Sequence, residues 1–315
     1  MIGICGNRAN VCKSHCTCGR FADRIDHVGR ENLPANEIIE PSWSIMRRVA
    51  GSSVAVVLMG AAIFCCGGCQ LSGPAVATIH SKASSQTYIV HLPGIAGETQ
   101  FDHMWVTGLG SGGVADHLEI YDWTKPNIWI PALLAYAHNR SESRVIATHI
   151  AAKLKADPNA HIILTAWSGG CQVAIWALED LPPEAKIESL LLDAPSITPT
   201  YDLTRALSHV HNKMYVLTSP GDWFVLGLGT SLFGTSDGTR TLAAGLVGFT
   251  RPSSASVEQY RKIREMRYDS KWLRYGDLGG HSGAMGKDFA EFVLAPLLRA
   301  DRDKASRTIS PALAH

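Results

Sequence analysis

The feature that most constrains the fold is a regular alternation of two hydrophobic patterns that begins at residue 87. Short apolar runs rich in β-branched residues are typical of strands buried on both faces of a sheet. Six such runs occur: TYIVHL (87–92), HLEIYDW (117–123), HIILTA (161–166), IESLLLD (187–193), KMYVLTS (213–219) and, more weakly, KWLRYG (271–276). Helical patterns lie between them, and this alternation predicts an α/β fold with a mostly parallel sheet covered by helices on both faces.

Three helices are predicted between and after these strands. The first begins at Ser141 and ends before Asp157-Pro158, the second spans residues 169–178, and the third spans 285–299. Because no internal repeat interrupts this pattern, we expect residues 87–300 to form one domain, followed by a disordered tail at 301–315.

The stretch TAWSGG (165–170) stands at the carboxyl end of the third predicted strand, where open α/β sheets bind ligands. A sharp strand-turn-helix junction there would expose the Ser168 hydroxyl above the sheet. It requires small residues two positions before and after the serine, and these are Ala166 and Gly170. A structural Ser-Gly-Gly turn would give the same letters, so the stretch has two interpretations.

The Ala-Trp-Ser-Gly-Gly sequence resembles the Gly-x-Ser-x-Gly elbow of the α/β-hydrolase family, with alanine in place of the first glycine. The resemblance implies a serine nucleophile, an acid on a later strand end and a histidine last. Asp222 follows the strand 213–219, and His281 lies in a glycine-rich loop before the final helix. Asp193, at the end of the preceding strand, is the alternative acid.

An acyl-transfer site also needs two fixed N–H donors for the oxyanion, and losing one costs about 3 to 4 kcal/mol of barrier. Gly169, directly after Ser168, supplies one by this resemblance. The loop HLPGIAGE (91–98) resembles the family's His-Gly-x-x-Gly turn and makes the N–H of Ile95 the other. A plain glycine turn is the alternative. His91 ends its strand, and we expect it to be packed or hydrogen-bonded rather than catalytic.

Two segments lie between the candidate acid and the histidine. Residues 223–252 are glycine-rich, apolar and almost uncharged, which is consistent with a wall or lid over the site, a membrane-facing patch or a poorly ordered loop. Residues 257–272 look like a polar surface helix. An apolar wall favours an acyl ester over a charged peptide as substrate.

The sequence gives no reason to expect a cofactor, a metal or a nucleic acid partner. The net charge is +1, and nucleic acid binding calls for a basic patch. GLGSGG (108–113) precedes a strand instead of following one, so it lacks the geometry of a dinucleotide loop.

The first 86 residues have a different character. Arg47-Arg48 precedes twenty uncharged residues, which indicates an export signal at 46–69, and Gly67-Gly68-Cys69 resembles a bacterial lipobox in which Cys69 becomes lipidated. An uncleaved anchor and ordinary cleavage remain alternatives. Residues 1–45 are interpreted as a disordered or spurious extension rather than a zinc cluster, and 70–86 as a flexible tether.

Together these features predict a serine hydrolase that cleaves carboxylic esters of small-molecule or lipid-like acids. It would be exported and membrane-anchored on the periplasmic side of a bacterial envelope. An acyltransferase with the same triad and a non-catalytic scaffold of the same fold are the alternatives.

Overall fold

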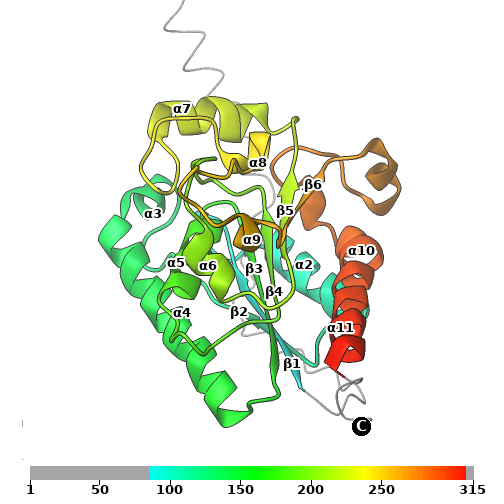
Figure 1. Cartoon of the computed structure of the whole chain (residues 1–315). Helices are drawn as coiled ribbons and strands as arrows, with labels where there is room; N and C mark the ends of the chain where they lie inside the picture. Colours follow the sequence, from blue (N-terminus) through cyan, green and yellow to red (C-terminus); the bar gives the residue numbers. More distant parts are fainter. Residues whose placement is uncertain (1–85, 310–315) are drawn as a thin grey trace, which may run out of the picture. The chain divides into compact units, whose positions relative to one another are not determined.

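Six parallel strands form one sheet in the order β2-β1-β3-β4-β5-β6 (Figure 1). The structure is a computed structural model that describes residues 86–309, all of which belong to one structural unit. The strands are β1 (Thr87–Leu92), β2 (His117–Ile120), β3 (His161–Trp167), β4 (Ser189–Asp193), β5 (Met214–Thr218) and β6 (Ile263–Arg267). Four of the five strongest apolar runs of the sequence contain one of these strands, and the run 161–166 covers all of β3 except Trp167.

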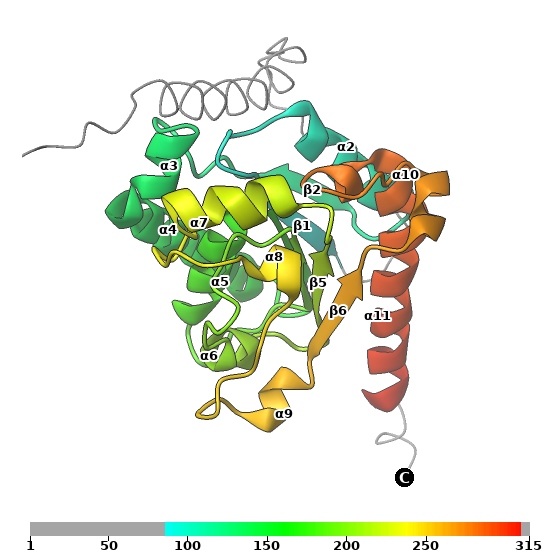
Figure 2. The ribbon, with the colours of Figure 1, turned by 90° about the horizontal axis from the view of Figure 1, so that it is seen from above.

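Helices cover both faces of the sheet, as Figure 2 shows from above. They are α2 (Gln100–Ser111), α3 (Ile130–Leu134), α4 (Tyr136–Ala156), α5 (Gly170–Glu179), α6 (Thr204–Ser208), α7 (Thr230–Phe233), α8 (Ala244–Val247), α9 (Val257–Tyr260), α10 (Lys287–Phe289) and α11 (Ala295–Ile309). Shorter 3-10 and π-helical turns span Trp223–Gly229, Ser270–Tyr275, Gly283–Met285 and Ala290–Leu294.

Two hydrophobic cores lie on opposite faces of the sheet because successive strand side chains point in opposite directions. On β1, Val90 belongs to the core that contains the apolar residues of α4 and α5. Its neighbour Ile89 belongs to the core that contains those of α2 and α11. Every residue of β4 and β5 is buried, which explains why these central strands are apolar throughout. The sheet, its helices and the strand-turn-helix junction after β3 define an α/β-hydrolase fold.

The sixth strand lies outside the predicted position. Residues 271–276 belong mostly to a 3-10 helix, and the strand is Ile263–Arg267, inside the segment that the sequence suggested was a polar helix. β6 pairs with β5 along one side only. An edge strand with solvent on its outer side tolerates the charged residues that hide it from a pattern search.

The prediction of a disordered tail from residue 301 is wrong for residues 301–309, which continue α11. The helix makes polar contacts with β5 and with residues that precede β2 and β4. The Tyr215 hydroxyl donates a hydrogen bond to Asp301, and Arg302 donates one to the Val114 carbonyl at 2.8 Å and forms an ion pair with Glu188.

The predictions for residues 1–45 and for the export signal at 46–69 with lipidation at Cys69 lie outside the described residues. So does the predicted tether at 70–86, except for its last residue. Across residues 86–309, none of the helices combines the length and the hydrophobicity that crossing a bilayer requires.

Candidate active site

Ser168 occupies a strained turn between β3 and α5. Its backbone φ is +54°, a conformation that a non-glycine residue adopts only at a cost of about 1 to 3 kcal/mol. A Cβ at Gly170 would lie 2.3 Å from the Pro93 carbonyl oxygen, so the start of α5 crosses the end of β1 too closely for a side chain. The structure therefore explains the small residue two positions after the serine. Ala166, on the other side, is fully buried in the core.

The structure brings His281 and Asp222 to Ser168. His281 Nε2 lies 2.9 Å from Ser168 Oγ, and His281 Nδ1 lies 2.7 Å from Asp222 Oδ2. Because a carboxylate can only accept, Nδ1 carries the proton toward Asp222, and Nε2 of the neutral ring accepts from the serine hydroxyl. The Asp222 side chain is 1% exposed and that of His281 12% exposed, so the chain of hydrogen bonds is shielded from water.

The loop that carries His281 is fixed by two hydrogen bonds. Trp167 Nε1, at the end of β3, donates to the His281 carbonyl oxygen at 2.9 Å. The Gly280 N–H donates to Ser219 Oγ, just after β5, at 2.8 Å. Neither Trp167 nor Ser219 was singled out from the sequence. Their positions directly after or at strand ends are the only sequence signal that pointed to them.

Asp193, the alternative acid, makes no hydrogen bond to His281 in this structure. It ends β4 and is buried, and its Oδ2 has no hydrogen-bond partner among residues 86–309. Burial, together with the nearby carboxyl groups of Asp277 and Asp222, raises the pKa of Asp193 well above its usual range. The backbone of Asp193, not its side chain, contacts the candidate nucleophile, because the Asp193 carbonyl accepts a hydrogen bond from the Ser168 N–H at 2.9 Å.

Ile95 and Gly169 lie against each other beside Ser168. A Cβ at Gly169 would lie 2.6 Å from Ile95 Cγ2. Within the described part of the chain, neither backbone N–H of this pair has a hydrogen-bond acceptor. The two groups therefore remain available to a ligand oxygen.

Three hydrogen bonds hold the carbonyl groups of the Ile95 loop. Trp123 Nε1 donates to the Pro93 carbonyl at 2.7 Å. The Gly97 N–H donates to the Gly94 carbonyl at 3.1 Å, and the Trp129 N–H donates to the Ile95 carbonyl at 2.6 Å. The carbonyl oxygens at 93, 94 and 95 are thus all engaged, whereas the Ile95 N–H has no acceptor among the described residues.

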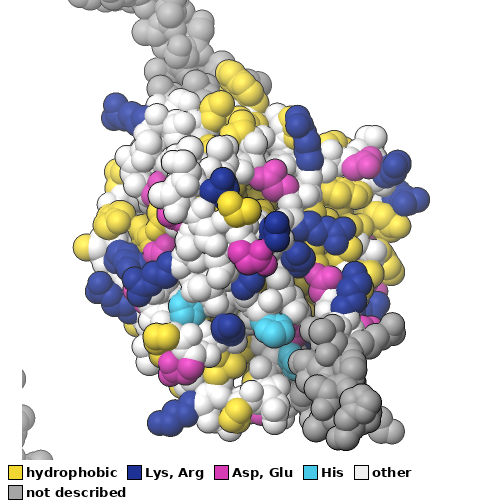
Figure 3. Space-filling model, in the orientation of Figure 1, with side chains coloured by type: hydrophobic (Ala, Val, Ile, Leu, Met, Phe, Trp, Pro, Cys, Tyr) yellow, Lys and Arg dark blue, Asp and Glu magenta, His cyan; other side chains and the backbone are white. Residues whose placement is uncertain are grey.

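Exposed apolar side chains lie on segments that adjoin the site residues in the chain. The π-helical turn Trp223–Gly229 begins directly after Asp222, and Trp223 is 62% exposed. Figure 3 shows hydrophobic side chains at the end of the molecule where α7 lies. Ile128, Trp129 and Ile130, which precede or begin α3, are also exposed. Among the described residues no group of His, Cys, Asp and Glu side chains is arranged to hold a metal ion.

Comparisons with known proteins give only distant likenesses. No protein-family model matches the chain, and no curated protein matches its sequence. It is similar to an esterase from Pyrococcus furiosus (9% identity over 71% of this chain and 84% of that chain, TM-score 0.41). It is also similar to a putative carboxylesterase from Lactobacillus plantarum (14%, 74% and 90%, TM-score 0.40) and a CIB-like hydrolase from Thermoplasma acidophilum (15%, 70% and 89%, TM-score 0.37). Likenesses this distant assign no activity to this chain.

Proposed function

We propose that this protein is a serine hydrolase that cleaves carboxylic esters. The observation that carries the proposal is the continuous hydrogen-bonded chain from the strained Ser168 through His281 to the buried Asp222. A serine hydroxyl is a weak nucleophile, and this chain is the arrangement that activates it. A structural turn would need neither the positive φ at Ser168 nor a histidine held on the hydroxyl.

In the proposed reaction, Ser168 Oγ attacks the ester carbonyl carbon while His281 Nε2 takes the hydroxyl proton. Asp222 accepts the hydrogen bond from Nδ1–H and stabilises the imidazolium. The N–H groups of Gly169 and Ile95 hold the negative oxygen of the tetrahedral intermediate. His281 then gives its proton to the leaving alcohol, and water, deprotonated by the same imidazole, releases the acyl group from Ser168.

The surroundings of the site support an uncharged acyl ester as substrate. The exposed side chains Trp223, Phe224 and Val225 follow the candidate acid directly, and Trp129 and Ile130 are exposed near the Ile95 loop. Trp129 is tied to that loop through the Ile95 carbonyl. Apolar side chains offer favourable contacts to an acyl chain and none to a charged group.

The test is hydrolysis of p-nitrophenyl esters by the wild type, by Ser168→Ala and by the control Ser196→Ala. Removing the nucleophile should lower kcat by at least about 10⁴-fold. Ser196 is buried, and its N–H donates to the Ser168 carbonyl oxygen, so its variant reports nonspecific disturbance near the elbow. Equal activity in all three proteins would refute the proposal.

Product analysis then separates hydrolysis from acyl transfer. With a short acyl ester in the presence of a primary alcohol, a hydrolase gives mainly the free acid. A dominant yield of the transesterified product would instead identify an acyltransferase with the same triad.

A further inference from the structure

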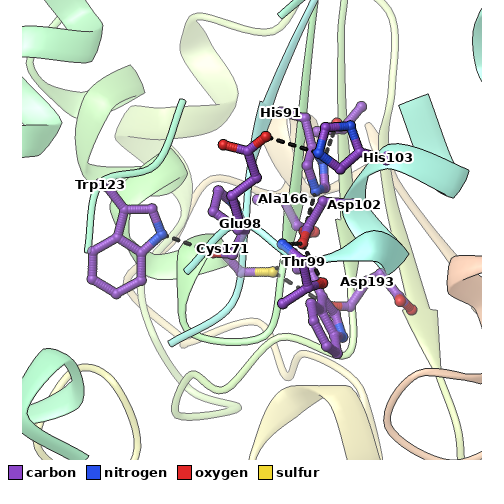
Figure 4. Close-up of polar contacts among 12 residues, drawn as sticks. His91, Glu98, Thr99, Asp102, His103, Trp123, Ala166, Cys171 and Asp193 are labelled. Atoms are coloured by element: carbon purple, nitrogen blue, oxygen red, sulfur yellow. Dashed lines mark hydrogen bonds and ion pairs between the residues drawn. The ribbon is translucent and has the colours of Figure 1, made fainter. Parts of the chain in front are cut away.

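A second histidine-aspartate pair lies in the interior of the domain, apart from the candidate triad. His91 Nε2 lies 2.9 Å from Asp102 Oδ1 (Figure 4). His91 Nδ1 lies 2.8 Å from Thr165 Oγ1. The side chains of His91 and Asp102 are both fully buried. A buried pair of this kind is costly to assemble unless all of its polar atoms are satisfied.

Both groups of this pair are fully satisfied. Asp102 Oδ1 accepts from His91, and Asp102 Oδ2 accepts from the Thr99 N–H at 2.7 Å and from the Thr99 hydroxyl at 2.6 Å. Since an ionised carboxylate only accepts, His91 carries a proton on Nε2. In the neutral ring, Nδ1 then accepts from the Thr165 hydroxyl.

The positions of these residues in the chain give the pair its significance. His91 lies on β1, two residues before Pro93, and Asp102 lies in the first turn of α2, three residues after Thr99. The pair thus joins the two ends of the loop 93–98, which carries Ile95. Thr165 lies on β3, three residues before Ser168, so the same hydrogen-bonded chain also reaches the strand that ends at the elbow.

A second contact joins the last residue of the loop 93–98 to α2. His103 Nε2 on α2 lies 2.9 Å from Glu98 Oε1, and both side chains are partly exposed (Figure 4). Solvent screens the attraction between His103 and Glu98, so this outer pair contributes little to the free energy of unfolding. The buried pair is the one whose loss would leave polar groups without partners inside the fold.

We propose that His91 and Asp102 are positioning residues of the oxyanion hole: they hold both ends of the loop 93–98 and thereby fix the N–H of Ile95 beside that of Gly169. This inference rests on the proposed function. Oxyanion donors act by being held in place before the charge develops, so small displacements reduce their effect strongly. Neither side chain touches the substrate, because both are fully buried.

The chain offers a matched control. Glu188 is a buried carboxylate that also pairs with a histidine, since His161 Nδ1 lies 2.8 Å from Glu188 Oε2. His161 is the first residue of β3, whereas Ser168 follows the last, so this pair lies at the opposite end of the sheet from the site. Asp102→Asn and Glu188→Gln each remove one buried charge from a histidine pair, although Glu188 also pairs with Arg302 of α11. Only the first variant touches the loop.

The experiment measures hydrogen exchange of the hydrogen-bonded loop amide, that of Gly97, together with kcat and KM for a p-nitrophenyl ester. In Asp102→Asn we expect loop exchange to rise by at least about tenfold. We expect kcat to fall by about 10²-fold with KM changed by less than about threefold. Glu188→Gln should leave the loop exchange and kcat at wild-type values.

Thr165→Val provides a second variant in case Asp102→Asn does not fold, because it removes one hydrogen bond without changing the side-chain shape. It should show the same two changes, smaller in size. Loop exchange equal to that of Glu188→Gln would overturn the inference, and so would faster exchange with unchanged kcat. An inactive wild type would overturn the proposed function instead, while loop exchange still reports whether the pair holds the loop.

Discussion

Two aspartates at neighbouring strand ends make an instructive comparison. Asp193 ends β4, and Asp222 lies in the turn that follows β5; the two strands pair directly. Both side chains are buried, and Asp193 Oδ2 and Asp222 Oδ1 both lack a hydrogen-bond partner among the described residues. Only Asp222 uses its other oxygen to hold His281, at 2.7 Å.

The difference arises from the turn between β5 and Asp222. A Cβ at Gly221 would lie 3.3 Å from the Gly280 nitrogen, so this turn passes close to the loop that carries His281. Asp193 is still on its strand, and its backbone carbonyl is used by Ser168. Burial alone therefore does not make a catalytic acid; the turn that carries the carboxyl group to the histidine does.

The largest effect is expected when the carboxyl group of Asp222 is replaced by an amide. Asp222→Asn should lower kcat by about 10⁴-fold, because the amide stabilises the wrong tautomer of His281 and cannot stabilise its charged form. Steady-state kinetics on a p-nitrophenyl ester measures this. Activity near the wild-type value would show that Asp222 is not the acid.

A second prediction sharpens the contrast through pH. The raised pKa of Asp193 means that the folded protein holds a proton which the unfolded chain loses above about pH 4. The free energy of unfolding of the wild type should therefore fall as pH rises above that point, by at most about 1.4 kcal/mol per pH unit for this group.

Asp193→Asn resembles the protonated form at every pH and lacks this slope. Relative to the wild type, it should gain stability as the pH is raised from 4 toward 8, as measured by urea unfolding at each pH. Asp277 also has a raised pKa because of burial, and the difference between wild type and variant cancels its contribution. Parallel stability profiles would contradict the account of Asp193.

The smallest expected effect is that of Asp193→Asn on kcat. Because Asp193 makes no hydrogen bond to His281, Asp193→Asn should keep kcat within about threefold of the wild type. A loss as large as that of Asp222→Asn would instead give Asp193 a part in the reaction. Circular dichroism of the variant at the assay pH would exclude unfolding as the cause.

Much of the candidate site could be predicted from the sequence because it depends on local order along the chain. Ser168 sits between a strand and a helix, and Asp222 and His281 sit in glycine-containing turns at later positions. Parallel strands bring their carboxyl ends to one edge of the sheet, so these residues meet there. Trp123, which holds the Pro93 carbonyl from thirty residues away, has no comparable local signal.

Helix α2 has no counterpart among the predicted elements, and its glycines explain why. A Cβ at Gly108 would lie 2.2 Å from the Lys287 carbonyl oxygen, and one at Gly112 would lie 2.3 Å from Ala295 Cβ. These glycines allow the last turn of α2 and its end to pack closely against α10 and α11, but in the sequence GLGSGG resembles a loop. Tertiary packing overrides helix propensity there.

Export and lipidation at Cys69 remain predictions of the sequence.

The most direct test of the central claim is labelling of the folded wild type with a fluorophosphonate, followed by peptide mapping. The account predicts one adduct, on Ser168, because its hydroxyl is held against a histidine that accepts its proton. The Thr165 hydroxyl also contacts a histidine, but that residue is fully buried. The adduct should disappear in Ser168→Ala and after unfolding before exposure to the probe. Absence of an adduct on Ser168 in the folded protein would contradict the claim that this chain is a serine hydrolase.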